Sequence, residues 1–323
     1  MVSRRFFYLT CFVALLALMF AETAWTQTVT QADEFLRNRM AGVRRSIGTA
    51  ASWHATDDEL GVLWRQLAND YADELDFPQS EDAFAHSLKL LRTSPSQRLY
   101  AAVLADLASL YVEIGRLKEA ESCGDKALAI YEGVGDQVGV VRVRLGLAIA
   151  FLHDHRFAES EDASAKALKS LQEQKEPNQS DLVTGLIANS YAKCFLDRCS
   201  EALVAAGQAM GIARALFSRD STLVVTSLMA LGFEEWKTGA PADGEKAMRE
   251  ALELLRQKKN MPYPMLIDAQ LKVLTSYTNY LKATHQKVEA KQVENEIARL
   301  KQEQTPYCRD CTINVLTLSK AMR

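Results

Sequence analysis

Apolar residues recur along the chain at helical spacing, in units that resemble one another. In one unit, Leu104, Leu107 and Tyr111 stand three and four positions apart, as on one face of a helix. A second stretch with helical spacing begins at Ala120. Gly115 lies between the two stretches, where a tight turn needs a residue that tolerates positive φ. The pattern therefore predicts two antiparallel helices.

The same two-helix frame occurs six times. Its turns are expected at residues 75, 115, 155, 197, 239 and 285, which gives spacings of 40, 40, 42, 42 and 46 residues. A fixed period of this kind is the signature of a repeat architecture. Thr56 and Glu59 predict a capping box that opens the first unit, and Ser180 is expected to cap the fourth.

The frame resembles the tetratricopeptide repeat, which places large apolar, Leu-Gly, Tyr, Ala, Phe and Ala residues at fixed offsets. The matching residues are Trp64, Leu67, Ala68, Tyr71 and Phe84, then Leu104, Leu107, Tyr111, Gly115, Ala120 and Ala127. The resemblance covers about residues 57–300. The period exceeds the usual 34 residues and is similar to the roughly 42-residue form of kinesin light chains. The resemblance implies an all-α fold, a right-handed α-solenoid (superhelix) of about six antiparallel helix pairs.

The first residues have the pattern of an export signal. Arg4 and Arg5 precede an apolar run over residues 6–20, which is short for a bilayer-spanning helix. Residues 1–26 are therefore predicted to be a signal peptide, or alternatively an uncleaved N-terminal anchor. The expected location is periplasmic or secreted, and contact with a membrane is expected only through an uncleaved leader.

The rest of the chain divides into three parts. Residues 30–55 are expected to form a capping helix and a connector, with Phe35, Met40 and Val43 at helical spacing. The repeat array is expected over residues 56–300, and residues 301–323 are expected to form a C-terminal tail.

Composition and charge narrow the function. Hydrophobic residues make up 48% of the chain, which is ample for a packed core. With 38 basic and 41 acidic residues, the formal net charge of −3 argues against nucleic acid as a partner. Five cysteines follow the leader, so they cannot all pair within the chain. Two local disulfides are possible, Cys194–Cys199 and Cys308–Cys311.

No set of catalytic residues stands out. The His-Asp-His sequence at residues 153–155 falls on an expected turn, and its histidines are too close in sequence to read as a zinc site. Cys308-x-x-Cys311 has the spacing of a redox pair, but no strand is predicted beside it. We expect no enzyme activity, no cofactor, no metal and no small-molecule substrate.

The first helices of the pairs should line the concave face of the solenoid. The positions expected in this groove are Arg65, Asn69, Asp106, Arg142, Tyr191, Met229, Phe233, Lys272 and Asn279. The tetratricopeptide resemblance implies that Arg65 and Asn69 belong to a clamp for a terminal carboxylate. Asp106 replaces the Asn expected in such a clamp, which leaves it incomplete. The expected partner is a protein that offers a peptide segment to this groove.

Two other functions are compatible with the sequence. One is a self-assembling structural protein of the cell envelope, joined through Cys123 or the tail. The other is an enzyme with an unrecognised site on the solenoid. The scaffold that binds a peptide is the main hypothesis.

Overall fold

The computed structural model describes residues 31–258 and 260–305 and consists, in this part of the chain, of helices without any strand. A helix over residues 31–48 and a short 3-10 helix, η1 (Ala50–Trp53), come first. Six antiparallel pairs follow: α2 (Asp57–Asp73) with α3 (Phe77–Leu91), α4 (Gln97–Glu113) with α5 (Leu117–Gly133), α6 (Gln137–His153) with α7 (Phe157–Gln172), α8 (Gln179–Phe195) with α9 (Cys199–Leu216), α10 (Thr222–Lys237) with α11 (Pro241–Gln257), and α12 (Tyr263–Ala283) with α13 (Lys287–Gln304). The expected all-α, right-handed solenoid is confirmed. None of the described helices is long and apolar enough to cross a bilayer.

The six expected turns are the points at which the chain reverses within each pair. Each turn residue adopts positive φ: Leu75, Gly115, His155, Asp197, Gly239 and His285, with φ values of 59°, 76°, 59°, 62°, 94° and 61°. At each turn, the N–H of the next residue donates to a carbonyl five positions earlier, as Arg116 does to Tyr111 at 2.8 Å. This bond is the helix-ending pattern that satisfies carbonyls left open at a helix C-terminus. Four of the six turns adopt it without glycine, because the bonds hold the strained residue in place.

Small side chains allow the two helices of a pair to approach closely. The residue five positions after each turn is buried and small, and these residues are Ser80, Ala120, Ser160, Ala202, Gly244 and Ala290. Ser80 and Ser160 donate their hydroxyl hydrogen bonds to the carbonyl oxygens of Ala68 and Ala148 on the facing helices, both at 2.8 Å. A buried hydroxyl is thereby satisfied without adding bulk.

A row of arginine side chains joins consecutive pairs. Arg116, Arg156 and Arg198 each stand just before the second helix of their pair. Arg116, for example, binds Glu119 on its own helix and Glu81 on the second helix of the preceding pair, both at 2.9 Å. Arg156 and Arg198 repeat this arrangement one and two pairs later. Because water reaches these ion pairs, each link adds little to stability by itself.

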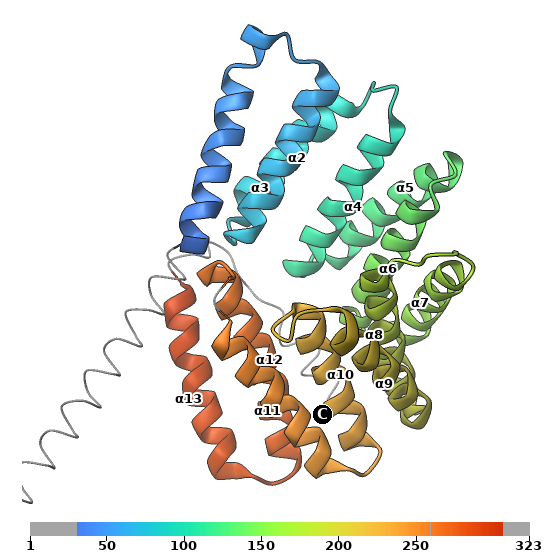
Figure 1. Ribbon diagram of the computed structural model, residues 1–323, viewed down its shortest axis with the longest axis vertical. Helices are drawn as coiled ribbons and strands as arrows, with labels where there is room; N and C mark the ends of the chain where they lie inside the picture. Colours follow the sequence, from blue (N-terminus) through green and yellow to red (C-terminus); the bar gives the residue numbers. More distant parts are fainter. Residues whose placement is uncertain (1–30, 259, 306–323) are drawn as a thin grey trace, which may run out of the picture.

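The solenoid curves until its ends meet. In Figure 1 the lower end of the helix over residues 31–48 lies close to the upper ends of α12 and α13. There the backbone N–H of Tyr263 donates to the carboxylate of Asp33 at 2.9 Å. Leu36, Met40 and Val43 of the first helix are buried against the first pair. Phe35, which shares the helical spacing of Met40 and Val43, is 67% exposed beside this contact.

Replacing Gly244 by Ala tests the close approach. A Cβ at this position would lie 2.5 Å from the backbone oxygen of Gly232, so α10 and α11 must separate. We expect a loss of about 1–3 kcal/mol in the free energy of unfolding, measured by urea titration with circular dichroism.

Gly207→Ala is the matched control, because a Cβ on this exposed glycine of α9 would meet no atom within 4 Å. It should leave stability unchanged or raise it by about 0.5–1 kcal/mol through helix propensity. Equal stability of the two variants would contradict the account.

Candidate functional site

A hollow of about 650 Å³ lies on the inner side of the array, between α4 and α6. Its lining includes several small side chains, among them Ala102, Ala105, Ser109 and Gly146. Three arginines, Arg65, Arg98 and Arg142, stand around it. First helices of three successive pairs supply these arginines, so the stacking of the repeats builds the hollow.

Each of these arginines reaches an aspartate of the next pair. Arg65 Nε lies 2.7 Å from Asp106, Arg98 Nε lies 2.7 Å from Asp136, and Arg142 Nε lies 3.4 Å from Asp181. The side chains of Arg98 and Arg142 remain 63% and 59% exposed, while those of Asp136 and Asp181 are only 16% exposed. The charge presented to solvent at this rim is therefore mainly positive.

The carboxylate clamp implied by the resemblance is filled from within the chain. Asp106 accepts hydrogen bonds from Arg65 at 2.7 Å and from Asn69 at 2.9 Å. The Nε of Arg65 and the side-chain amide of Asn69 thus already bind Asp106, and Arg65 is only 34% exposed. The more exposed arginines at the hollow are Arg98 and Arg142, of which only Arg142 was predicted to lie in the groove.

The prediction that Met229 and Phe233 lie on the groove surface is wrong. Both are buried among the helices of the fourth and fifth pairs. Phe233 packs between Phe195 and Trp236, with ring centroids 5.4 and 6.0 Å away. Tyr191 is half-buried and contacts Phe233 at 5.6 Å. These residues belong to the core because the neighbouring pair covers them.

Lys272, on α12, forms an ion pair with a residue of the second helix pair, across the inner side of the curved array. Its ammonium group lies 2.7 Å from Glu113 at the end of α4, and 2.9 Å from Asp268 on its own helix. Desolvation by the surrounding protein works against ionisation of the half-exposed Glu113, but Lys272 holds the pKa of this carboxyl below its ordinary value. Asn279 is half-buried on the same helix, and it has an interaction partner.

The His-Asp-His segment lies at the third turn. Burial lowers the pKa of His153, at the end of α6, and Glu113 opposes that shift. His155 is the turn residue, and its ring lies edge-on to Phe157 at 5.8 Å. The two histidines therefore have different surroundings and do not converge.

The fourth turn carries a disulfide. Cys194 and Cys199 are joined, with their Cα atoms 4.0 Å apart. Glu234 on α10 lies beside them and is 0% exposed. Burial raises the pKa of Glu234 to about 9, against smaller opposing effects of Ser190 and Lys237. This carboxyl was not predicted, because a lone Glu on a helical face gives no sign that it is buried.

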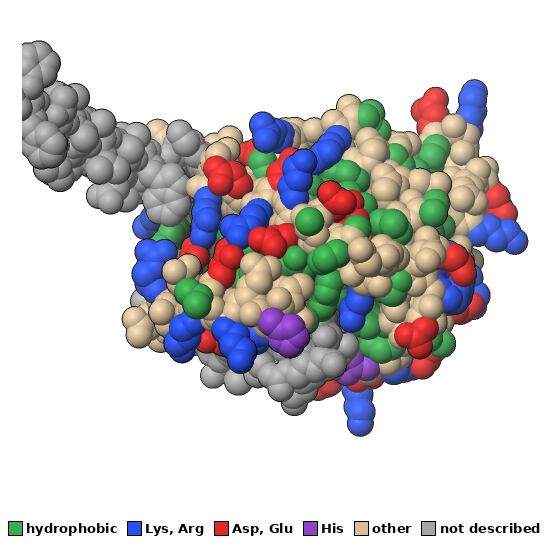
Figure 2. All heavy atoms as spheres, turned by 90° about the horizontal axis from the view of Figure 1, so that it is seen from below, with side chains coloured by type: hydrophobic (Ala, Val, Ile, Leu, Met, Phe, Trp, Pro, Cys, Tyr) green, Lys and Arg blue, Asp and Glu red, His purple; other side chains and the backbone are tan. Residues whose placement is uncertain are grey.

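Several expectations fall outside the described residues. They are the leader over residues 1–26, Cys308 and Cys311, and most of the expected C-terminal tail. Cys123, on α5, is half-buried and unpaired. On the face drawn in Figure 2, acidic and basic side chains are intermixed rather than gathered into one field.

A family model for the tetratricopeptide repeat matches residues 59–133 and 101–173. Those ranges include α4, α6 and the arginines around the hollow. No curated protein sequence matches the chain.

Solved structures share the fold at low sequence identity. Aspartyl phosphate phosphatase F from Bacillus subtilis is 10% identical, with a TM-score of 0.68, over 86% of this chain and 70% of that one. BtubC (BKLC) from P. vanneervenii is 20% identical, with a TM-score of 0.57, over 68% of this chain and 90% of that one. A Rap protein complexed with competence and sporulation factor is 13% identical, with a TM-score of 0.57, over 85% and 88%. At these identities the likeness establishes the fold alone.

Lys272→Ala tests the contact across the ring. Removing the ion pair with Glu113 should loosen the closure and raise the radius of gyration measured by small-angle X-ray scattering. Stability should fall by no more than about 1 kcal/mol, because both side chains are half-exposed. The ion pair lowers the pKa of Glu113 and is lost when this carboxyl takes up a proton. The parent should therefore also loosen as the pH falls through the pKa of Glu113.

Lys282→Ala is the control, since it breaks a 2.8 Å pair with Glu294 inside the last helix pair. An equal change in radius for both variants would show that Lys272 has no special part in closing the ring.

Glu234→Gln tests the buried carboxyl in the oxidised protein without added metal. The ordinary pKa of the group is 4.5, and in the folded chain it is about 9. Between these two pH values Glu234 keeps its proton in the folded chain but has released it in the unfolded chain. Glu234 therefore makes stability fall as pH rises through this window. At pH 8 the variant should exceed the parent by on the order of 3 kcal/mol in unfolding free energy, with little difference near pH 4.5.

Glu253→Gln, at an exposed position of α11, should show no such divergence in urea titrations at the two pH values. Parallel pH curves for Glu234→Gln and the parent would contradict burial of an orphaned acid.

Proposed function

Because the chain contains tetratricopeptide repeats, we propose that it is a binding scaffold that holds a peptide segment of a protein partner in its concave groove. The hollow between α4 and α6 is the observation that carries this proposal. The small side chains in its lining leave room for a main chain, and its arginines offer charged donors. The turn spacing of 40 to 46 residues supports the longer, kinesin-light-chain-type form of the repeat.

The charges at the rim favour an acidic segment. The exposed guanidinium groups belong to Arg98 and Arg142, whose aspartate partners are largely covered. Each pair uses the arginine Nε, so the outer nitrogens are placed to bind a second carboxylate. An acidic side chain or a free C-terminus of the partner fits this chemistry. The Rap protein of the same fold, solved with competence and sporulation factor, supports a role in holding another molecule.

The proposed location is outside the cytoplasm, in the periplasm or secreted. The basic and apolar order of residues 1–26 supports export, and the Cys194–Cys199 disulfide supports an oxidising compartment.

Replacing Arg98 and Arg142 together by Ala tests the groove. Peptides selected from a random displayed library against the parent chain should be enriched in Asp, Glu or a free C-terminus. By fluorescence anisotropy, their affinity for the double variant should fall at least roughly tenfold, as expected for the loss of charge-assisted bonds.

Arg214→Ala is the matched control. Arg214, on α9, is 53% exposed and forms a 3.0 Å ion pair with Glu250 on α11. Both residues lie on second helices, away from the hollow. It should bind the selected peptides as the parent does. If no peptide is enriched, or if the double variant keeps its affinity, the proposed groove is wrong.

A further inference from the structure

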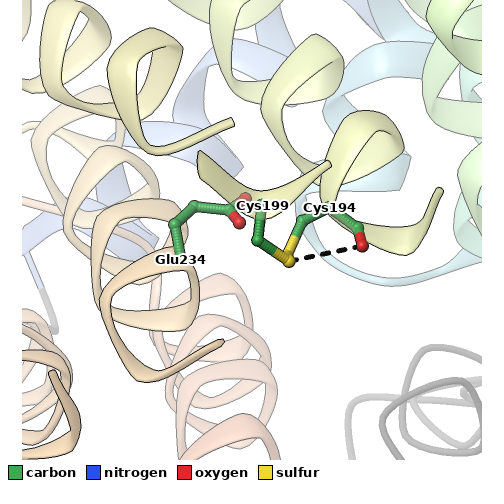
Figure 3. A group of neighbouring side chains, drawn as sticks. All are labelled: Cys194, Cys199 and Glu234. Carbon is green, nitrogen blue, oxygen red and sulfur yellow. Dashed lines mark hydrogen bonds between the residues drawn. A yellow bond between two sulfur atoms is a disulfide. The ribbon is translucent and has the colours of Figure 1, made fainter. Parts of the chain in front are cut away.

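Cys194, Cys199 and Glu234 meet between the fourth and fifth helix pairs. Figure 3 shows the Glu234 carboxylate directed from α10 toward the two sulfur atoms at the turn between α8 and α9. A sulfur atom of each cysteine and a carboxylate oxygen all lie within 4.8 Å of one another. Within the described residues, no other group of His, Cys, Asp and Glu side chains is arranged in this way.

The carboxyl group of Glu234 lacks a hydrogen-bond partner. Within residues 31–258 and 260–305, neither of its oxygens has one, although the residue is fully buried. The Ser190 hydroxyl is near enough to lower the pKa of Glu234 slightly, but it donates its hydrogen bond to the carbonyl oxygen of Ile187 at 3.0 Å. A buried polar group without a partner costs about 1–3 kcal/mol and calls for an explanation, such as an ion that binds it.

The three side chains have the chemistry of a zinc site once the sulfurs are separate. Cys194 and Cys199 form a Cys-x4-Cys pair around a tight turn, within the usual spacing of zinc ligands. Two thiolates with one carboxylate make a donor set that binds a thiophilic cation in preference to Mg²⁺ or Ca²⁺. A water molecule would complete a four-coordinate shell, since three protein ligands leave one position open.

We propose that reduction of the Cys194–Cys199 disulfide creates a binding site for a zinc-class divalent cation, held by both thiolates and the Glu234 carboxylate. In the disulfide state the two sulfur atoms are bonded to each other, so they cannot bind the cation as thiolates. The proposal concerns the fourth and fifth pairs and does not depend on the peptide groove.

The reduction balances with a dithiol as the electron donor. Cys199 is half-buried and Cys194 is buried, so a thiolate of the donor attacks the Cys199 sulfur. The Cys194–Cys199 bond breaks, and Cys194 leaves with the electron pair and takes up a proton. The second thiol of the donor then attacks the mixed disulfide, which releases Cys199 and leaves the donor oxidised. When the cation binds, the protons of both thiols and of Glu234 pass to solvent.

The test uses the full chain with Cys11, Cys123, Cys308 and Cys311 replaced by Ser, so that no other thiol competes. The protein is reduced with a dithiol, freed of it under anaerobic conditions, and titrated with Co²⁺ as a spectroscopic substitute for Zn²⁺. The expected result is thiolate-to-cobalt charge-transfer absorption that saturates at one Co²⁺ per chain and is abolished by Zn²⁺. The same chain in its disulfide form should show none.

Glu234→Gln should weaken Co²⁺ binding at least roughly tenfold, since it removes a ligand rather than a supporting group. Glu235→Gln, at the next position of α10, should bind like the parent. Circular dichroism of each variant establishes that the helices are kept. Absence of the charge-transfer band in the reduced chain, equal binding by the disulfide form, or full affinity of Glu234→Gln would each overturn the proposal.

Discussion

The rest of the structure depends on the close approach of the two helices within each pair. A small residue five positions after each turn brings the backbones together, and at Gly232 and Gly244 no Cβ can be added without displacing backbone. The approach fixes how each pair presents its first helix, and the stacked first helices form the inner wall. The arginine–aspartate contacts around the hollow follow from that stacking, since each joins neighbouring first helices or the residue that caps one.

Because each pair repeats the same geometry, small rotations accumulate into the curvature of the array. Contacts between distant parts of the sequence result: Asp33 meets Tyr263, and Glu113 meets Lys272. A repeat protein usually gains stability from neighbouring units alone. Here the first helix and the last pair also contact each other, so the inner wall is a closed perimeter whose width depends on a few polar contacts.

The period made the fold predictable, and the local turn chemistry made the pairs predictable. All six turns lie where the sequence placed them, and Thr56 with Glu59 forms the expected capping box. The cap of α8 is Asn178 rather than Ser180, a two-residue error typical of helix ends. The candidate site was less predictable, because exposure depends on rotation between pairs. That rotation buries Phe233, and a single-helix pattern contains no information about it.

The buried Glu234 shows where such an array can accommodate an unfavourable group. Stability in stacked repeats is largely local, so the cost of an orphaned acid falls on the pairs that surround it. The fourth to sixth pairs contain a continuous apolar cluster, including Phe233, Tyr280 and Leu274, that can offset this cost. The hollow between α4 and α6 lies in earlier pairs and relies on exposed, paired charges that cost little. The buried acid thus lies in the best-packed part of the array, and the exposed charge pairs lie along the inner wall of the earlier pairs.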